Sequence, residues 1–155
     1  MSGGRTEHAG GADAGQTPLG HQMERTSQEI LDAGMAVRRE VLGDAHVDRA
    51  EAKKDATTDD FQNLISRYAW GTIWTRPGLD RRMRSAVTIT AMVAHGHWEE
   101  LAMHIRAAIT NGLSRDEIKE ILLQTAIYCG VPSANTAFKT AQQVFRDIDT
   151  ERHGQ

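Results

Sequence analysis

The sequence predicts an all-α protein of about six main helices joined by short loops. From residue 27 onward, apolar residues recur at the 3.6-residue spacing of amphipathic helices. Capping residues and glycine or proline stops divide this periodic sequence into segments of ordinary helix length. We find no alternation of apolar and polar residues that would indicate a strand or a hairpin. These observations favour antiparallel helices packed around one core.

The composition is that of a single globular domain. The chain has 155 residues, of which 39% are hydrophobic and 25% are charged, so it is too short to predict two domains. We expect a mobile tail over residues 1–22, a single domain over 23–150 and a short tail over 151–155. A net charge of −3 gives no indication of a nucleic-acid or anionic-membrane partner. Because we find no signal peptide and no apolar run of about 20 residues, we expect a cytoplasmic protein.

The first half of the chain divides into three helical segments. The first runs from Ser27 to Val41 and ends at Gly43, and Asp44 can begin a short helix after it. The next begins near residue 58 and ends at the Arg-Pro-Gly sequence of residues 76–78. Its apolar residues keep the 3.6-residue period: Phe61, Leu64, Ile65, Tyr68 and Ile73.

The second half is punctuated by clearer caps. A helix capped by Asp80 and ended at Gly96 is followed by one over about residues 97–110. Ser114 and Glu117 then fit a capping box, in which each side chain accepts a hydrogen bond from the other residue's backbone N–H. Two more helices follow, and the sequence YCGVP separates them.

Three polar residues near the end of the chain could carry out acid–base chemistry. His104 lies on or beside an apolar helix face, as either a packed histidine bonded to a backbone carbonyl or a general acid or base. Glu117 is the capping-box glutamate, but it also shares a stripe with Gln124 and Tyr128 at the edge of the apolar face. That stripe could line a small polar pocket or could be solvated.

A segment rich in tryptophan and arginine precedes this region. Residues 68–84 contain two of the three tryptophans, including Trp74, and four arginines within nine residues, including Arg76 and Arg84. Such a segment is either a solvated basic face or a carboxylate-binding wall, because guanidinium groups bind carboxylates through two hydrogen bonds. Periodicity does not decide between the two.

Cys129 is the single cysteine of the chain, and it excludes an intrachain disulfide framework and a CxxC redox pair. It falls among apolar residues, as is typical of a small buried hydrophobe. Histidine, cysteine and carboxylate ligands at zinc spacing are also missing from the sequence, so we expect no metal site.

Four blocks of the chain resemble the 4-carboxymuconolactone decarboxylases. These blocks are residues 37–48 (VRREVLGDAHVD), residues 70–79 (WGTIWTRPGL), residues 104–108 (HIRAA) and residues 117–132, which begin EIKE and end YCGVP. They occur in order at family spacing over about residues 30–147. The resemblance implies an alkylhydroperoxidase-like helical subunit assembled into a ring-like homo-oligomer, a hexamer or a trimer.

The wider superfamily also contains alkylhydroperoxidase-like proteins with a redox CxxC. In those proteins the CxxC begins twelve residues after a glutamate, and a histidine follows it. Here Glu117 and Cys129 have the same separation, but Pro132 stands in place of the second cysteine and Thr136 in place of the histidine. A dithiol peroxidase needs a resolving thiol, so this activity is not expected. A single-cysteine redox protein and a non-catalytic helical oligomer that binds ligands stay open as alternatives.

The resemblance implies conversion of 4-carboxymuconolactone to 3-oxoadipate enol-lactone and CO2, in protocatechuate degradation. The lactone carbonyl of the substrate can accept the electrons left behind when CO2 departs, so no cofactor is expected. In this hypothesis His104 donates the proton or stabilises the oxyanion, Glu117 orients it, and Tyr128 is a lesser candidate donor. The substrate-binding residues are Trp74, which forms a wall of the pocket, and Arg76 and Arg84, which anchor carboxylate.

Overall fold

The computed structural model describes residues 25–154, and these residues form helices and loops only. The predicted tail over residues 1–22 lies outside them. The elements, in chain order, are α2 (Ser27–Leu42), α3 (Asp44–Ala52), α4 (Asp59–Ile65), the π-helix η1 (Ser66–Trp74), α5 (Arg81–His95), α6 (Trp98–Thr110), α7 (Arg115–Tyr128) and α8 (Val131–His153). The prediction of an all-α fold is therefore confirmed. None of these helices is long and apolar enough to cross a bilayer.

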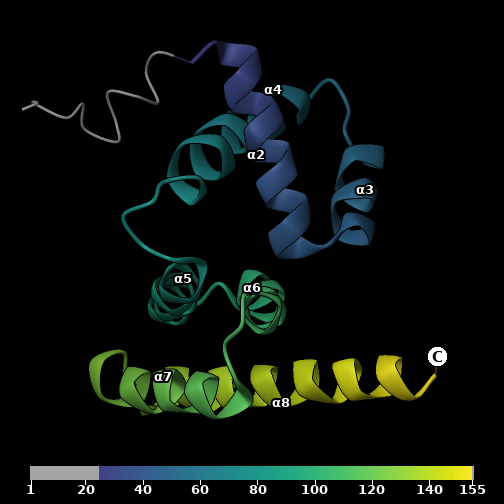
Figure 1. The fold of residues 1–155 in the computed structure, drawn as a ribbon. Coiled ribbons are helices and arrows are strands. Elements are labelled where there is room, and N and C mark those ends of the chain that lie inside the picture. The colour runs from purple at the N-terminus through teal and green to yellow at the C-terminus, as the bar shows by residue number, and fades with distance from the viewer. Residues whose placement is uncertain (1–24, 155) are drawn as a thin grey trace, which may run out of the picture.

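The helices form three layers (Figure 1). The upper layer holds α2, α3, α4 and η1, the middle layer holds α5 and α6, and the lower layer holds α7 and α8. The main core lies between the middle and lower layers and includes Ile89, Leu101, Ile105 and Leu122. A smaller core joins the upper layer to α6 and centres on Trp70. The candidate site lies beside this smaller core.

The predicted caps are present. The Asp80 side chain accepts a hydrogen bond from the Met83 backbone N–H, and Gly96 ends α5 in the left-handed conformation. Ser114 and Glu117 form both hydrogen bonds of the capping box at the start of α7.

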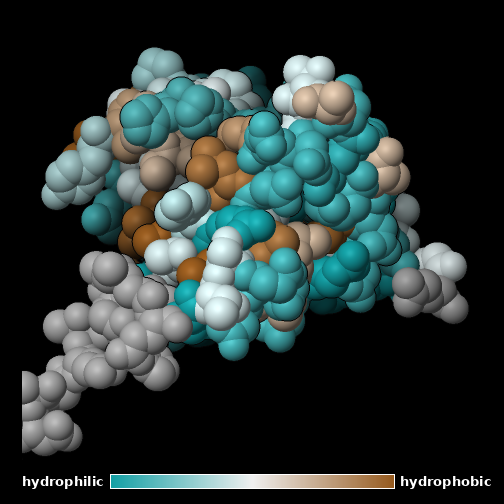
Figure 2. Space-filling view, turned by 90° about the horizontal axis from the view of Figure 1, so that it is seen from above, coloured by the Kyte–Doolittle hydropathy of each residue, from teal (hydrophilic) through white to brown (hydrophobic). Residues whose placement is uncertain are grey.

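The helical period predicted after residue 58 is wrong beyond Ile65. From Ser66 the chain continues as a π-helix, whose i→i+5 hydrogen bonds widen each turn and change which residues share a face. The buried residues of η1 are Ser66, Trp70 and Gly71, whereas Tyr68 and Ile73 of the predicted 3.6-residue face are exposed. Phe61 and Leu64 of that face are exposed as well, although they lie in α4. In the view from above, brown apolar surface is exposed among the teal polar surface (Figure 2).

The helix α8 continues past the domain boundary predicted at residue 150. It remains helical to His153, and the Glu151 carboxylate accepts hydrogen bonds from both terminal nitrogens of Arg106 on α6. This two-point contact ties the last turn to the middle layer. Residues 151–153 therefore belong to the last helix of the domain.

Two glycines let α2 lie directly against η1. A Cβ atom at Gly34 would come within 2.1 Å of the Ser66 carbonyl oxygen, and one at Gly71 within 2.3 Å of the Ile30 carbonyl oxygen. Both distances are far below van der Waals contact, so backbone meets backbone at this crossing. The position of η1 relative to α2 is thus tightly constrained.

Candidate active site

His104 lies on α6, where its side chain is buried against the upper layer. The residue is 9% exposed, and its Nδ1 atom has no hydrogen-bond partner among residues 25–154. The Trp74 ring lies nearly parallel to the imidazole, with ring centroids 6.4 Å apart and an interplanar angle of 12°. A packed histidine bonded to a backbone carbonyl would engage its buried nitrogen, which this histidine does not. An unpaired polar atom at a buried position is typical of a functional site.

Burial lowers the pKa of His104 to about 4. The nearby Glu100 carboxylate acts in the opposite direction, and His46 lowers the pKa further. The imidazole is therefore neutral near pH 7, with one nitrogen as a donor and the other as an acceptor. In this form it can donate a hydrogen bond to a developing oxyanion without carrying a charge of its own.

The burial of a neutral histidine makes stability depend on pH. The unfolded chain takes up a proton on this histidine near pH ~6.5, whereas the folded chain does so only near 4, so stability falls as the pH drops between these values. When the pH falls from about 7 to 5, we expect the free energy of unfolding to decrease by about 2 kcal/mol more in the wild type than in His104→Gln. Urea unfolding at the two pH values measures this difference. Equal slopes in the wild type and His104→Gln would contradict the assignment.

The π-helix η1 places two tryptophans on the side facing His104. Trp70 and Trp74 lie four residues apart, and their rings stack with centroids 5.2 Å apart. Trp70 is buried, while Trp74 lies between Trp70 and His104. The three rings thus form one continuous stack, in which Trp74 joins Trp70 to His104.

Trp74 also lines a small pocket that contains Arg84. The pocket has a volume of about 110 Å³, and its walls are Ile73, Trp74, Leu79, Arg84, Val87 and Thr88. One terminal nitrogen of Arg84 donates to the Arg76 carbonyl oxygen at 2.9 Å, while its buried Nε has no partner within the described chain. A pocket of this size has room for a carboxylate group.

Arg76 and Arg84 form an uncompensated pair of cations. Burial lowers the pKa of Arg84, and the positive charge of Arg76 lowers it further. No carboxylate among residues 25–154 forms a salt bridge with either arginine. Two neighbouring guanidinium groups without an acidic partner favour the binding of an anion. Their position next to the stack of aromatic rings makes this the candidate active site.

The described residues contain no group of three or more histidine, cysteine or acidic side chains that could hold a metal ion. The donors that converge here are imidazole, indole and guanidinium groups. This set suits an organic anion.

Comparisons with known proteins place this chain in a family. The family model described as the carboxymuconolactone decarboxylase family matches residues 59–143. The chain is also 48% identical to a 4-carboxymuconolactone decarboxylase of Acinetobacter baylyi over 115 residues, which are 74% of this chain and 86% of the relative. The chain belongs to the carboxymuconolactone decarboxylase family. The resemblance inferred from the four sequence blocks is thereby confirmed.

Two further relatives are also decarboxylases by name. A nitrosuccinic acid decarboxylase of Metarhizium robertsii is 40% identical over 121 residues, covering 78% of this chain and 85% of the relative. A 4-carboxymuconolactone decarboxylase of Pseudomonas putida is 58% identical over 44 residues, covering 28% of this chain and 92% of that sequence. The part of this chain that matches the family model contains Trp74, Arg84 and His104.

The Glu117 carboxylate, at the start of α7, is engaged by a hydrogen bond and an ion pair. One carboxylate oxygen accepts a hydrogen bond from the Ser114 backbone N–H at 2.8 Å, and the other pairs with Arg82 of α5. The Ser114 backbone N–H, followed by Arg82, lowers the pKa of this carboxylate. These are the contacts of a helix cap and an interhelical ion pair. The role of Glu117 in orienting His104 stays a prediction, and these contacts do not join the two residues.

The variant Glu117→Gln separates the capping role from a catalytic one. Glutamine also serves in a capping box, so the change keeps the cap and removes the charge. Because both carboxylate oxygens are engaged away from His104, we expect a folded protein that retains its kcat/KM for decarboxylation within about threefold, a change far smaller than the loss of an acid–base group. Arg82→Met, which removes the other half of the ion pair, is the matched control. A large loss of kcat in Glu117→Gln alone, with a shifted pH profile, would instead support the orienting role.

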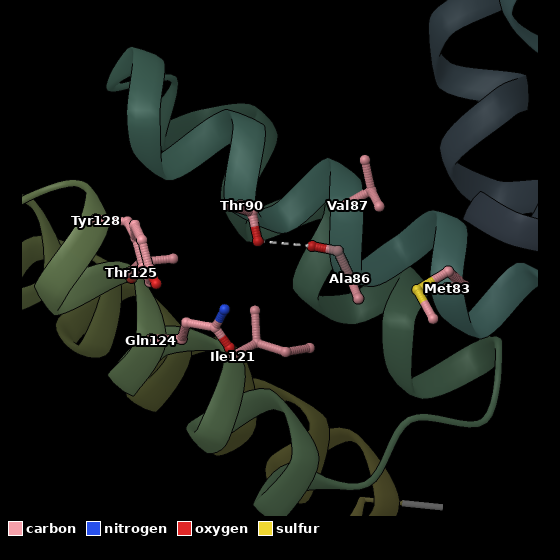
Figure 3. Close-up of a pocket in the computed structure, with 8 residues that line it drawn as sticks. All are labelled: Met83, Ala86, Val87, Thr90, Ile121, Gln124, Thr125 and Tyr128. Atoms are coloured by element: carbon pink, nitrogen blue, oxygen red, sulfur yellow. Dashed lines mark hydrogen bonds between the residues drawn. The ribbon is translucent and has the colours of Figure 1, made fainter.

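Tyr128 lines a different pocket, between α5 and α7 (Figure 3). This pocket has a volume of about 360 Å³ and is lined by Met83, Ala86, Val87, Thr90, Ile121, Gln124, Thr125 and Tyr128. Gln124 and Tyr128 of the stripe on α7 line this pocket, whereas Glu117, the third residue of the stripe, does not. Tyr128 is 81% exposed, and within one subunit no described contact joins it to His104. Its role as a proton donor stays a prediction.

Sequence reasoning missed two polar residues near the site, Arg38 and His46. Arg38 is buried on α2, on the same face as Gly34 and Val41. The spacing of these three residues, at positions i, i+4 and i+7, would have placed Arg38 on the buried face. His46 on α3 is half-buried, and its pKa is lowered by burial and then by Arg38. It precedes the buried Val47, but no periodic pattern in this short helix distinguishes it.

Proposed function

We propose that the protein decarboxylates 4-carboxymuconolactone to 3-oxoadipate enol-lactone and CO2, in protocatechuate degradation. Family membership and the similarity to the Acinetobacter baylyi enzyme support this proposal. In the structure, the observation that carries it is a buried neutral histidine whose ring stacks with Trp74, which also lines a pocket with Arg84, one of two neighbouring arginines without an acidic partner among residues 25–154. The comparisons favour this activity over the single-cysteine redox alternative.

The chemistry of the reaction needs little from the protein. When the carboxylate on the ring carbon leaves as CO2, its bonding electrons pass through the ring double bond to the lactone carbonyl oxygen. The resulting enolate then takes up one proton on a ring carbon. The protein has to anchor the retained carboxylate, stabilise the oxyanion with a hydrogen-bond donor and deliver that proton.

The site residues divide these tasks in our proposal. Arg84, with Arg76 beside it, binds the retained carboxylate in the small pocket beside Trp74. The His104 imidazole donates to the carbonyl oxygen as negative charge develops there. The bound anion favours its protonated form, and this imidazolium passes its proton to the ring and is then reprotonated from solvent. Trp74 packs between the two and keeps water away, which strengthens both electrostatic interactions.

A direct assay tests the proposed activity. The purified full chain is mixed with 4-carboxymuconolactone, loss of the ultraviolet absorbance of the lactone is followed, and the released CO2 is measured. We expect turnover without added metal or cofactor. Nitrosuccinic acid is assayed in parallel, because one relative is named for its decarboxylation. Turnover of nitrosuccinic acid alone would overturn the proposed substrate, and turnover of neither would overturn the proposed activity.

We also propose that the subunit assembles into a ring-like homo-oligomer, a hexamer or a trimer. Large apolar side chains are exposed along α5 and α7 and at the start of α8: Met83, Val87, Leu123, Ile127, Tyr128 and Val131. Adjacent exposed apolar residues of this kind commonly mark an interface between copies of a chain. In such an assembly Tyr128 would be covered by a neighbouring subunit. A cytoplasmic location stays a prediction from the sequence.

A charge at the centre of this apolar surface should prevent assembly. Ile127 is 80% exposed, so Ile127→Glu should leave the subunit folded while making its association unfavourable. We expect light scattering to show an oligomer for the wild type and a single chain for Ile127→Glu. Asn135→Glu, an exposed position on α8 with the same change of charge, should keep the wild-type mass. A wild type that runs as a single chain at micromolar concentration would overturn the oligomer.

A further inference from the structure

The guanidinium group of Arg38 is buried within the upper layer, where its partners lie on α3, α4 and η1. The residue is 4% exposed, and its Nε has no hydrogen-bond partner among the residues that the structure describes. Burial lowers its pKa, and the nearest carboxylate, an oxygen of Glu51, lies 3.7 Å from Nη1. A buried cation whose donors are only partly satisfied is costly. A methionine would fill similar space without that cost, so stability alone does not explain an arginine here.

The hydrogen bonds of Arg38 go to one place in the chain, the junction between α4 and η1. Its Nη2 donates to the Gln62 side-chain carbonyl at 3.2 Å, and its Nη1 donates to the Ser66 hydroxyl at 3.4 Å. Gln62 lies in α4, and Ser66 is the first residue of η1. The planar guanidinium thus bridges the last turn of the α-helix and the first turn of the π-helix.

This junction is the start of the π-helix that carries the rings stacked with His104. Ser66, Trp70 and Trp74 follow one another at four-residue intervals along η1, and the two tryptophan rings stack. Trp74 then covers the His104 ring. Because Gly34 and Gly71 hold α2 and η1 in backbone contact, a shift of the π-helix register cannot be absorbed by a looser crossing.

We propose that Arg38 is a positioning residue of the site, which holds the α4–η1 junction and thereby keeps Trp74 stacked over His104. The expected effect on turnover rests on the proposed function. The effect on the Trp74–His104 stack does not, so the two are measured separately.

Tryptophan fluorescence reports on the stack, because a protonated imidazole quenches a neighbouring indole. All variants carry Trp98→Phe, so that Trp70 and Trp74 are the emitters. In the protein that keeps Arg38, we expect the fluorescence to change near pH 4, the pKa of His104. If this transition disappears in His104→Gln, it is due to the titration of His104. The charged groups that act on His104 are Glu100 on α6 and His46 on α3.

Arg38→Met should uncover His104 and move this transition upward by about one pH unit or more, because water regains access to the imidazole. Arg38→Lys keeps the positive charge that acts on His46 but lacks the planar fork, and we expect it to shift the transition as well. Arg39→Met is the matched control. Arg39 is the next residue of α2, and its partners are the exposed Asp44 and Asp48, so its loss should leave the transition unchanged.

Several outcomes would overturn the proposal. One is the same midpoint in Arg38→Met and Arg39→Met. Another is a shift in Arg38→Met but not in Arg38→Lys, which would assign the effect to charge and not to position. If Arg38→Met does not fold, Ser66→Ala removes one acceptor of the guanidinium, and its midpoint should move in the same direction. An unchanged midpoint in Ser66→Ala would then count against the proposal.

The kinetic arm uses the lactone assay on the same variants. Because Arg84 is untouched, we expect Arg38→Met to lower kcat by about tenfold or more and to change KM by less than about threefold. If the wild type does not decarboxylate the lactone, the proposed function fails while the fluorescence titration still decides the role of Arg38. If the wild type is active, an equal loss of kcat in Arg39→Met would overturn the positioning role.

Discussion

Replacing His104 by glutamine is expected to lower kcat/KM for decarboxylation by about 10²–10⁴-fold, the usual contribution of a positioned acid–base group. Glutamine fills similar space and can still donate a hydrogen bond, but it cannot take up and release a proton. The loss should appear mainly in kcat, because the proposed carboxylate anchor is unchanged. Steady-state kinetics with the lactone measure both constants.

The control for this variant is His97→Gln. His97 is exposed in the loop before α6, where its ring stacks on that of His95. It should keep near wild-type kinetics. If His104→Gln is folded and retains kcat/KM within about tenfold of the wild type, His104 is not the proton donor, because that loss is below the range of acid–base groups.

The state of His104 also predicts the direction of the pH profile. With a pKa of about 4, the free imidazole stays neutral across the neutral range, so the charge of this residue in the free enzyme does not change above pH ~6. Binding of a negatively charged substrate beside it favours the protonated form and raises its pKa. The same histidine can thus be a neutral hydrogen-bond donor in the free enzyme and a protonated acid in the complex.

The sequence predicted the helices well where local signals determine them. Asp80, Gly96 and the Ser114–Glu117 box act within one turn of the chain, and all three perform their predicted capping roles. The burial of His104 also followed from its place beside Leu101 and Ile105 on one helix face. Such features depend on spacing within a single element, which the sequence displays directly.

The sequence could not predict features that arise from contacts between elements. The 3.6-residue period fails in η1 because the backbone there adopts i→i+5 hydrogen bonds in close contact with α2. For the same reason, the stack of Trp70, Trp74 and His104 was not apparent as a unit. The ion pair between Glu117 and Arg82 joins residues 35 positions apart, and no local pattern links them. The packing of α5 against α7 determines that the Glu117 carboxylate pairs with the Arg82 guanidinium.

Replacing Arg84 by methionine should weaken substrate binding by roughly 30-fold or more, because removing one partner of a desolvated charge pair costs about 2 kcal/mol or more. The guanidinium has a free buried Nε and no acidic partner among residues 25–154, so in our proposal its counter-ion is the retained carboxylate of the substrate. The effect should appear chiefly as a higher KM. Binding of a non-reacting dicarboxylate such as adipate, measured by calorimetry, should weaken in parallel.

Two comparisons separate this anchoring role from a general effect on the fold. Arg81→Met removes a guanidinium from the same first turn of α5, but Arg81 is already paired with Glu40, so its loss should leave KM nearly unchanged. Arg84→Lys keeps the charge without the two-point geometry, so it should lie between the wild type and Arg84→Met. A KM in Arg84→Met equal to that of Arg81→Met would show that the carboxylate binds elsewhere. The comparison requires that all three variants unfold at similar urea concentrations. A rise in KM that is confined to the Arg84 variants then identifies Arg84 as the anchor. The reason is that a contact that binds substrate and transition state equally changes KM and not kcat.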